Sequence, residues 1–238
     1  MLDGLRDRVR LAGARVAAPS AAVMDSQSVR AAATVGRATR GWDGGKKVAG
    51  RKRHVVVDTM GLPLAVLVTP ASTQDRVAAR GLLRRMRDTA GKRAAPVWAD
   101  GGYTGPLLDW ARRTFGLVVE IVERPRVPCV TVLPRRWVVE RSLAWITGHR
   151  RCVRDYERPP HHHEAMVRWS MIRITSRRLT QHQQLGNGHL SNFTRSARRG
   201  RSPLLRRAAF RATAVAGAVP RGRLPGTAPT SPWWSADR

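Results

Sequence analysis

Residues 54–68 read HVVVDTMGLPLAVLV, and this stretch decides the fold class. Two apolar runs rich in β-branched residues, 54–58 and 62–68, are separated by Asp58-Thr59-Met60-Gly61, a good turn sequence. The pattern predicts a β-hairpin. The turn also explains Asp58, which needs no functional role.

Three further strands and two helices are predicted around this hairpin. AAVMDSQSV (21–29) is expected to be a short buried strand that stops at Asp25, and APVWAD (95–100) and LVVEIVERP (117–125) are further strands. Helices are expected over 75–91 and 105–116, each ending at a glycine. The inward positions of the first helix are Val77, Leu82, Leu83 and Met86, and Asp75 is expected to cap it. The order is strand, hairpin, helix, strand, helix, strand.

Two more helices are predicted in the second half of the chain. In RRWVVERSLAWI (135–146), helical spacing places Glu140 away from the packing stripe, on the side of Arg136 and Thr147. The stripe consists of Val138, Val139, Leu143, Trp145 and Ile146. The second helix, 164–179, has Met166, Trp169, Ile172 and Ile174 as its expected inner face. Residues 180–238 are rich in Arg, Pro and Gly with one acid, which predicts disorder apart from a helix over 204–219.

The charge of the chain points to a polyanionic partner. Lys and Arg number 44 against 16 Asp and Glu, a formal net charge of +28. Such an excess favours strong, salt-dependent binding of nucleic acid. Arginine-rich codon usage explains part of the excess but not the scarcity of acids. Residues 35–54 are expected to form a glycine-rich basic loop, in which Lys46, Lys47, Arg51, Lys52 and Arg53 either hold phosphates or simply form a solvated connection.

Three acids stand out against this basic background. Asp25 and Asp100 fall where strands are expected to end, and Glu140 lies on an exposed helix face. Carboxylate oxygens are the ligands that Mg²⁺ prefers, and two divalent ions sharing three carboxylates can promote phosphodiester cleavage. Taken singly, each acid has a simpler explanation: Asp25 and Asp100 as turn or cap residues, and Glu140 as a surface ion pair with Arg136 or Arg141.

Four stretches together resemble the catalytic domain of bacterial insertion-sequence transposases of the aspartate-aspartate-glutamate (DDE) class. They are VMDSQSV (23–29), GKKVAGRKRHVVVDTMGLPLAVLVTPASTQDR (45–76), VWADGGYTG (97–105) and RRWVVERSLAWITGHRRCVRDYE (135–157). The resemblance runs from about Met24 to Leu179. It implies a ribonuclease-H-like α/β fold with a mixed sheet flanked by helices, and a catalytic site that uses two Mg²⁺ or Mn²⁺ ions.

Matched position by position, the resemblance assigns Asp25, Asp100 and Glu140 as catalytic metal ligands. Asp25 and Asp100 would share one ion, and Asp25 and Glu140 the other. Arg136 begins the arginine-three residues-glutamate signature, and we also expect it to contact DNA. The family's lysine seven residues after the glutamate is Thr147 here, so its DNA contact would pass to His149, Arg150 or Arg151. The family's tyrosine three residues before the arginine is Leu133.

The predicted organisation is a basic N-terminal remnant (1–20), the catalytic domain (21–179) and an Arg-rich tail (180–238). The family usually carries a DNA-end-recognising region before the first aspartate. Only 24 residues precede Asp25, so we expect a second reading frame that is joined to an upstream product, or a decayed copy.

The expected function is cleavage of DNA at element ends and strand transfer into target DNA, by a homodimer or larger synaptic assembly. The alternatives are a structure-selective nuclease of the same fold and a non-catalytic DNA-binding remnant. The glycine spacing at 41–47 does not match a phosphate-binding loop, so no nucleotide cofactor is expected. The sequence has no apolar run long enough for a membrane span, and a bacterial cytoplasmic or nucleoid location is expected.

Overall fold

The computed structural model describes residues 1–91, 96–122 and 135–199, with side chains up to residue 184. Met1–Gly186 form one compact unit. A second unit begins at Asn187, of which the described part, 187–199, is helical. The predicted helix over 204–219 and residues 123–125 of the last predicted strand lie outside the described residues.

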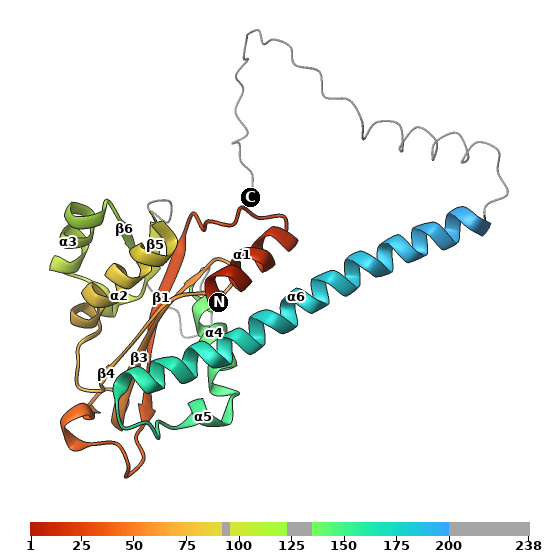
Figure 1. Cartoon of the computed structure of the whole chain (residues 1–238). Coiled ribbons are helices and arrows are strands. Elements are labelled where there is room, and N and C mark those ends of the chain that lie inside the picture. Colours follow the sequence, from red (N-terminus) through yellow and green to blue (C-terminus); the bar gives the residue numbers. More distant parts are fainter. Residues whose placement is uncertain (92–95, 123–134, 200–238) are drawn as a thin grey trace, which may run out of the picture. The chain divides into compact units, whose positions relative to one another are not determined.

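A mixed sheet forms the centre of the first unit (Figure 1). Its strands are β1 (Ala22–Arg30), β2 (Gly41–Asp43), β3 (Val48–Asp58), β4 (Pro63–Pro70), β5 (Pro96–Ala99) and β6 (Val118–Ile121). The strand order is β2-β3-β1-β5-β6, with β4 also paired to β3. The β1–β3 and β3–β4 pairs are antiparallel, whereas β1–β5 and β5–β6 are parallel.

The predicted hairpin is confirmed as β3 and β4. Oδ1 of Asp58 accepts hydrogen bonds from the backbone N–H groups of Met60 (2.8 Å) and Leu62 (2.9 Å), and Gly61 has a φ of +79°. Asp58 is therefore the turn residue that the sequence predicts. The prediction of a basic loop reaching residue 54 is wrong, because β3 already begins at Val48 and pairs with β1 along its length.

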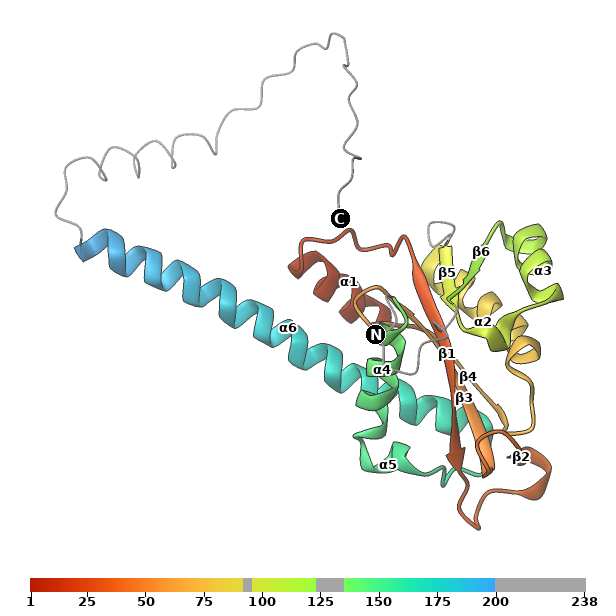
Figure 2. The ribbon, with the colours of Figure 1, turned by 180° about the vertical axis from the view of Figure 1, so that it is seen from behind.

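Helices cover both faces of the sheet. α2 (Asp75–Ala90) and α3 (Pro106–Phe115) lie on one face, whereas α4 (Trp137–Thr147) and the first part of α6 (Pro160–Arg199) lie on the other (Figures 1 and 2). The remaining helices are α1 (Leu2–Ala12), α5 (Arg150–Val153), and the 3-10 turns η1 (Arg37–Thr39) and η3 (Gly101–Tyr103). The mixed sheet between two helical layers confirms the expected ribonuclease-H-like α/β fold. No described helix has both the length and the apolar composition that a membrane crossing requires.

Strand alternation divides the core in two. Ala22 and Met24 of β1 pack with α2 and α3, and Val23 packs with α4 and α6. Val138, Val139, Leu143 and Ile146 of α4 are buried as predicted. Trp145 is only half-buried, and its ring stacks against the guanidinium groups of Arg141 and Arg178.

The predicted inner face of α6 is only partly right: Met166 and Ile174 are partly buried and pack against the core, but Trp169 does not. Trp169 is 65% exposed, whereas Val167 and Met171 are fully buried. The buried side also carries the polar residues His163 and Thr175, so the apolar pattern in the sequence identifies only part of the buried face. The helix also continues to Arg199, past the expected boundary at residue 179. In α2, Val77 is 60% exposed and is not a core residue.

Candidate active site

Asp25 lies inside β1 and not at its end, contrary to the sequence prediction. On one edge β1 pairs with β3 as far as Arg30, and Asp25 lies opposite Val55. On the other edge its parallel pairing with β5 ends at Val23 opposite Trp98. Asp25 therefore lies just past the end of the β1–β5 pairing. Its side chain points to the same face of the sheet as that of Val23, which is the face covered by α4. Continued along the same register, the ladder would place Asp25 opposite Asp100.

α4 brings the third carboxylate to this point. Glu140 lies in the first turn of α4, and Arg136 is the residue immediately before the helix. Nη2 of Arg136 lies 3.7 Å from Oδ2 of Asp25, 3.7 Å from Oδ2 of Asp100 and 3.4 Å from Oε1 of Glu140. No two of these oxygens are therefore more than twice 3.7 Å apart. The structure brings the three acids predicted from the sequence together around one guanidinium.

The predicted DNA contact of Arg136 stays a prediction, because in this structure its side chain does not face the surface. The Arg136 side chain is only 5% exposed, and its charged end faces the three carboxylates instead of the surface. Asp25, Asp100 and Glu140 are 14%, 34% and 48% exposed, so the site opens on the side of Glu140. Glu140 also benefits from its place at the positive end of the helix dipole.

Burial is the main influence on Asp25. Burial and, to a smaller extent, the nearby Asp100 charge together raise the pKa of the Asp25 carboxyl to about 6, although a hydrogen bond from the Ser26 N–H (2.7 Å) and the Arg136 charge act in the opposite direction. Oδ1 of Asp100 accepts a 3.0 Å hydrogen bond from the Gly102 N–H, which begins the η3 turn. Both aspartates are thus held by the backbone beside them.

A second polar cluster lies on the opposite face of β1. Oγ of Ser26 donates to Oδ1 of Asp75 at 2.8 Å, and the same Oδ1 lies 3.3 Å from Nζ of Lys52 and 3.7 Å from Nδ1 of His54. Burial lowers the pKa of His54 to about 4. The predicted cap role of Asp75 is wrong, because Gln74 is the N-cap and no side chain caps the helix.

Tyr103 extends this cluster towards the carboxylates. Its hydroxyl is buried and has no hydrogen-bond partner within the described part of the chain. Burial raises the pKa of Tyr103 well above its usual value, and the charges of Asp75, Asp25 and Asp100 act in the same direction. The sequence did contain one signal for the cluster: Ser26 is a polar residue on the face of β1 that carries Ala22 and Met24.

The structure divides the residues that were predicted to bind phosphate into an exposed group and a buried group. Lys46 and Lys47 are exposed in the turn at 44–47, and Nζ of Lys46 donates to the Ser26 carbonyl oxygen at 3.3 Å, beside Asp25. Arg51, Lys52 and Arg53 lie on β3 and are buried, which contradicts their predicted DNA contacts.

Each of the buried cations has internal partners. Arg51 pairs with Asp155 at 2.9 Å and donates to the Glu157 carbonyl oxygen at 2.7 Å. Arg53 donates to the Cys152 carbonyl oxygen at 2.8 Å and to Thr147 at 2.7 Å. Lys52 donates to the Thr73 carbonyl oxygen at 3.1 Å and lies near Asp43 and Asp75. These side chains hold the fold together and are not free to bind phosphate.

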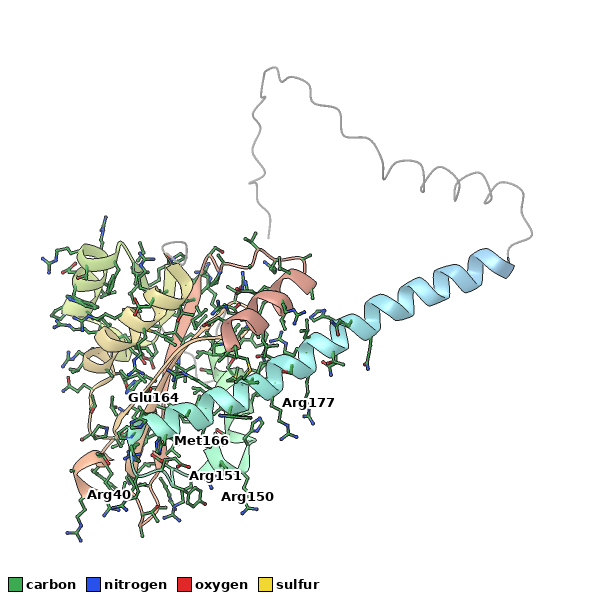
Figure 3. The ribbon with its side chains drawn as sticks, viewed as in Figure 1. Arg40, Arg150, Arg151, Glu164, Met166 and Arg177 are labelled. Atoms are coloured by element: carbon green, nitrogen blue, oxygen red, sulfur yellow. The ribbon has the colours of Figure 1, made fainter. Side chains whose placement is uncertain are left out.

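Arg150 and Arg151 are the first residues of α5, which follows the C-terminal end of α4, and both are exposed (Figure 3). They line an open groove of about 680 Å³ between α5 and α6, together with Met166 and Trp169. Arg151 is paired with Glu157. Of the predicted DNA contacts, Lys46, Lys47, Arg150 and Arg151 are the ones that solvent can reach.

The donor set fits a divalent cation. Three carboxylates converge on one positively charged nitrogen, and hard cations such as Mg²⁺ prefer such oxygen ligands. With the Arg136 guanidinium between them, no three Asp, Glu, His or Cys side chains within the described ranges lie close enough to share one ion. Asp25, Asp100 and Glu140 are the residues that could hold a metal at the position that the Arg136 guanidinium occupies in this structure.

Comparison with known proteins identifies the family of the chain. Residues 17–175 match the transposase DDE domain family. A curated relative, the putative transposase for insertion sequence element IS402 of Burkholderia cepacia, is 32% identical over 125 residues, which are 50% of this chain and 59% of that protein.

Among solved structures, the crystal structure of the Mos1 strand transfer complex matches with a TM-score of 0.33 and 8% identity, over 74% of this chain and 60% of that chain. This similarity is too low to add to the assignment. The family match covers the whole sheet, α4 and the three converging acids. The chain therefore belongs to the transposase DDE domain family.

Proposed function

We propose that this protein is a metal-dependent transposase that cuts DNA at the ends of an insertion sequence and joins the freed 3′-hydroxyl to target DNA. The observation that carries the proposal is the meeting of Asp25, Asp100 and Glu140, from β1, the end of β5 and α4, around one point. Three ionised carboxylates this close together repel one another, and the single positive charge of Arg136 balances only part of their negative charge.

Asp25, Asp100 and Glu140 would hold two Mg²⁺ or Mn²⁺ ions, with Asp25, the most buried of the three, shared between them. Bound divalent ions activate the attacking hydroxyl or water and neutralise charge on the phosphate. The protein supplies the rigidity. Asp25 is held within a paired strand, and Asp100 is fixed by the Gly102 N–H.

DNA would approach from the open side of the site, where Glu140 is 48% exposed. Lys46 lies beside Asp25 and would bind a phosphate next to the one that is cut. Lys47, Arg150 and Arg151 would hold the backbone farther away. Phosphate contacts of this kind position the duplex without reading its sequence.

The partners are proposed from the resemblance. Pairing of two element ends requires at least two copies of the chain. The curated relative is longer than the region matched here, so recognition of the ends would draw on a further segment or an upstream reading-frame product.

The direct test is to incubate the protein with DNA that carries the element's own ends, with Mg²⁺ or Mn²⁺, in the presence and absence of the upstream product. We expect nicking at the ends and strand-transfer products. Cleavage of flaps or junctions without joining would favour a structure-selective nuclease. DNA binding without any metal-dependent cleavage would identify a non-catalytic remnant.

A further inference from the structure

Arg136 is the shared counter-ion of the whole carboxylate site. Within the described part of the chain, it is the only cation that forms an ion pair with Asp25, Asp100 or Glu140. Its side chain is 5% exposed, so the guanidinium is enclosed together with the charges that it balances. A buried cation in this position lowers the repulsion among three acids that lie within a few ångströms of one another.

The positive charge of the Arg136 guanidinium suits the negatively charged site, but its distances to the carboxylate oxygens do not suit hydrogen bonds. The contacts of Nη2 at 3.4 to 3.7 Å are longer than the roughly 2.8 Å of a charge-assisted hydrogen bond. Nε of Arg136 is buried without a hydrogen-bond partner among the described residues. An arginine that was built only to stabilise the fold would be expected to use its five donors more fully.

A single guanidinium also leaves the site under-neutralised. Three ionised carboxylates carry three negative charges, and Arg136 supplies one positive charge. Mg²⁺ binds carboxylate oxygens at about 2.1 Å and brings twice the charge in a much smaller volume. The two cations compete for the same oxygens, because Nη2 already stands at the point on which these oxygens converge.

We propose that Arg136 is a resident cation that occupies the carboxylate site until a divalent ion displaces it. This inference rests on the proposed metal-dependent function and adds a regulatory step to it. Metal binds only the fraction of molecules in which the guanidinium has swung out, so the apparent metal affinity is reduced by that fraction. Arg136 thereby keeps the site assembled but closed.

The displaced guanidinium leaves on the side where Glu140 is exposed, which is also the side open to DNA. There it can form the two-pronged hydrogen bonds that arginine makes with phosphate. Phosphate binding and metal binding then favour the same swung-out state of Arg136. By linkage, each ligand must raise the affinity for the other by the same factor.

The test measures metal binding directly, without DNA and without cleavage. Mn²⁺ is titrated into the full chain and free Mn²⁺ is followed by electron paramagnetic resonance, for wild type, Arg136→Gln and Arg136→Lys. Arg135→Gln is the matched control, because the neighbouring Arg135 side chain is 56% exposed and pairs with Glu120 instead. We expect Arg136→Gln to bind Mn²⁺ about tenfold more tightly than wild type.

The sign of the effect separates the inference from a purely structural role. A variant that had merely loosened the site would bind Mn²⁺ more weakly, and that result would overturn the proposal. Arg136→Lys keeps the positive charge and should bind Mn²⁺ more weakly than Arg136→Gln. Equal affinities of wild type, Arg136→Gln and Arg135→Gln would show that Arg136 does not compete.

Failure of the proposed function has a different signature. If neither wild type nor Arg136→Gln binds Mn²⁺, the metal site itself is wrong, and this inference fails with it. If all variants bind Mn²⁺ equally, the metal site stands and only the competition is wrong.

A second measurement needs no variant and remains valid if Arg136→Gln does not fold. The buried Nε–H of Arg136 should exchange slowly with water in metal-free wild-type protein, and NMR of arginine-labelled protein can follow it. Saturating Mg²⁺ should accelerate this exchange, whereas the corresponding signal of Arg135 should not change. An Arg136 signal that is unaffected at saturating Mg²⁺ would overturn the proposal.

Discussion

Ser26 and Asp75 are joined by a 2.8 Å hydrogen bond that connects β1, the strand that carries Asp25, to the first residue of α2. Ser26 follows Asp25 directly, so their side chains point to opposite faces of the sheet. Asp25 meets Arg136 on one face, and Ser26 meets Asp75 on the other. The position of β1 in the site is therefore fixed from both sides.

Substitution of Asp75 should weaken this attachment. Asp75→Asn keeps the size of the side chain but removes the charge that faces Lys52 and His54, so unfolding should become easier by about 1 to 3 kcal/mol. Urea denaturation would measure the loss. A double-mutant cycle with Ser26→Ala should give a coupling free energy of about 1 kcal/mol between the two residues.

The control for this prediction is Asp88→Asn, an exposed carboxylate near the other end of the same helix. It should change stability by less than about 0.5 kcal/mol. Additive effects of Asp75→Asn and Ser26→Ala would show that the hydrogen bond contributes nothing.

Each of the three site carboxylates should be essential for cleavage but not for folding. Asp25→Asn, Asp100→Asn and Glu140→Gln keep side-chain size and remove one negative charge from the oxygens that would hold metal. We expect strand cleavage to fall by at least about a hundredfold in each case, because even changes to residues that only support metal ligands reduce metal affinity or activity by about ten- to a hundredfold. DNA binding should persist. Denaturing gels of a labelled nicked product would measure the cleavage rate.

Asp109→Asn is the control, because Asp109 is exposed in the first turn of α3. It should cleave DNA at the wild-type rate. Normal cleavage by Glu140→Gln would remove Glu140 from the ligand set.

Acid should destabilise the fold through His54. Its pKa is lowered to about 4 by burial, below the value of about 6.5 that an unfolded chain has. The unfolded state therefore binds the proton more tightly. The contribution of neutral His54 to the free energy of unfolding is complete above pH 6.5 and is lost as the pH falls towards 4. Between pH 7 and pH 5 this loss amounts to about 2 kcal/mol.

The measurement is urea unfolding of wild type and His54→Gln at the two pH values. Gln can still bond to Thr69, whose Oγ1 lies 2.9 Å from Nε2 of His54, but it does not titrate. The free energy of unfolding of His54→Gln should fall less between pH 7 and pH 5 than that of wild type. Equal falls would assign the acid sensitivity to other groups.

Removing charge from the exposed lysines and from the buried arginine of the basic segment should have different effects on DNA binding and stability. Lys46→Gln combined with Lys47→Gln should leave stability unchanged and reduce the salt dependence of DNA binding, with the slope of log K against log salt falling by about 2. Fluorescence anisotropy of a labelled duplex between low and moderate salt would measure the slope.

Arg51→Gln should show the reverse pattern. It breaks the buried pair with Asp155 and should cost about 3 to 5 kcal/mol of stability, while the salt slope of the remaining folded protein stays at the wild-type value. A reduced slope for Arg51→Gln would mean that this arginine reaches DNA after all.

The sequence by itself determined the parts of this protein that depend on neighbours along the chain. The hairpin turn at Asp58, the helix ends at Gly91 and Gly116, and the strand preceding Asp100 follow from turn chemistry and from the spacing of apolar residues. The family resemblance added the three acids. The resemblance predicts that these acids form one cluster, and the structure agrees. Strand register fixes the positions of the two aspartates, and the first turn of α4 fixes that of the glutamate.

Only the tertiary structure decided how the charges are paired. Arg51 and Lys47 belong to the same basic segment of the sequence, yet one is buried against Asp155 and the other is exposed. Arg136 has the same residue type and charge as its neighbour Arg135, but it alone faces the three carboxylates. Electrostatic partners are chosen through space, between elements far apart in the chain, and neither periodicity nor composition encodes which cation meets which anion.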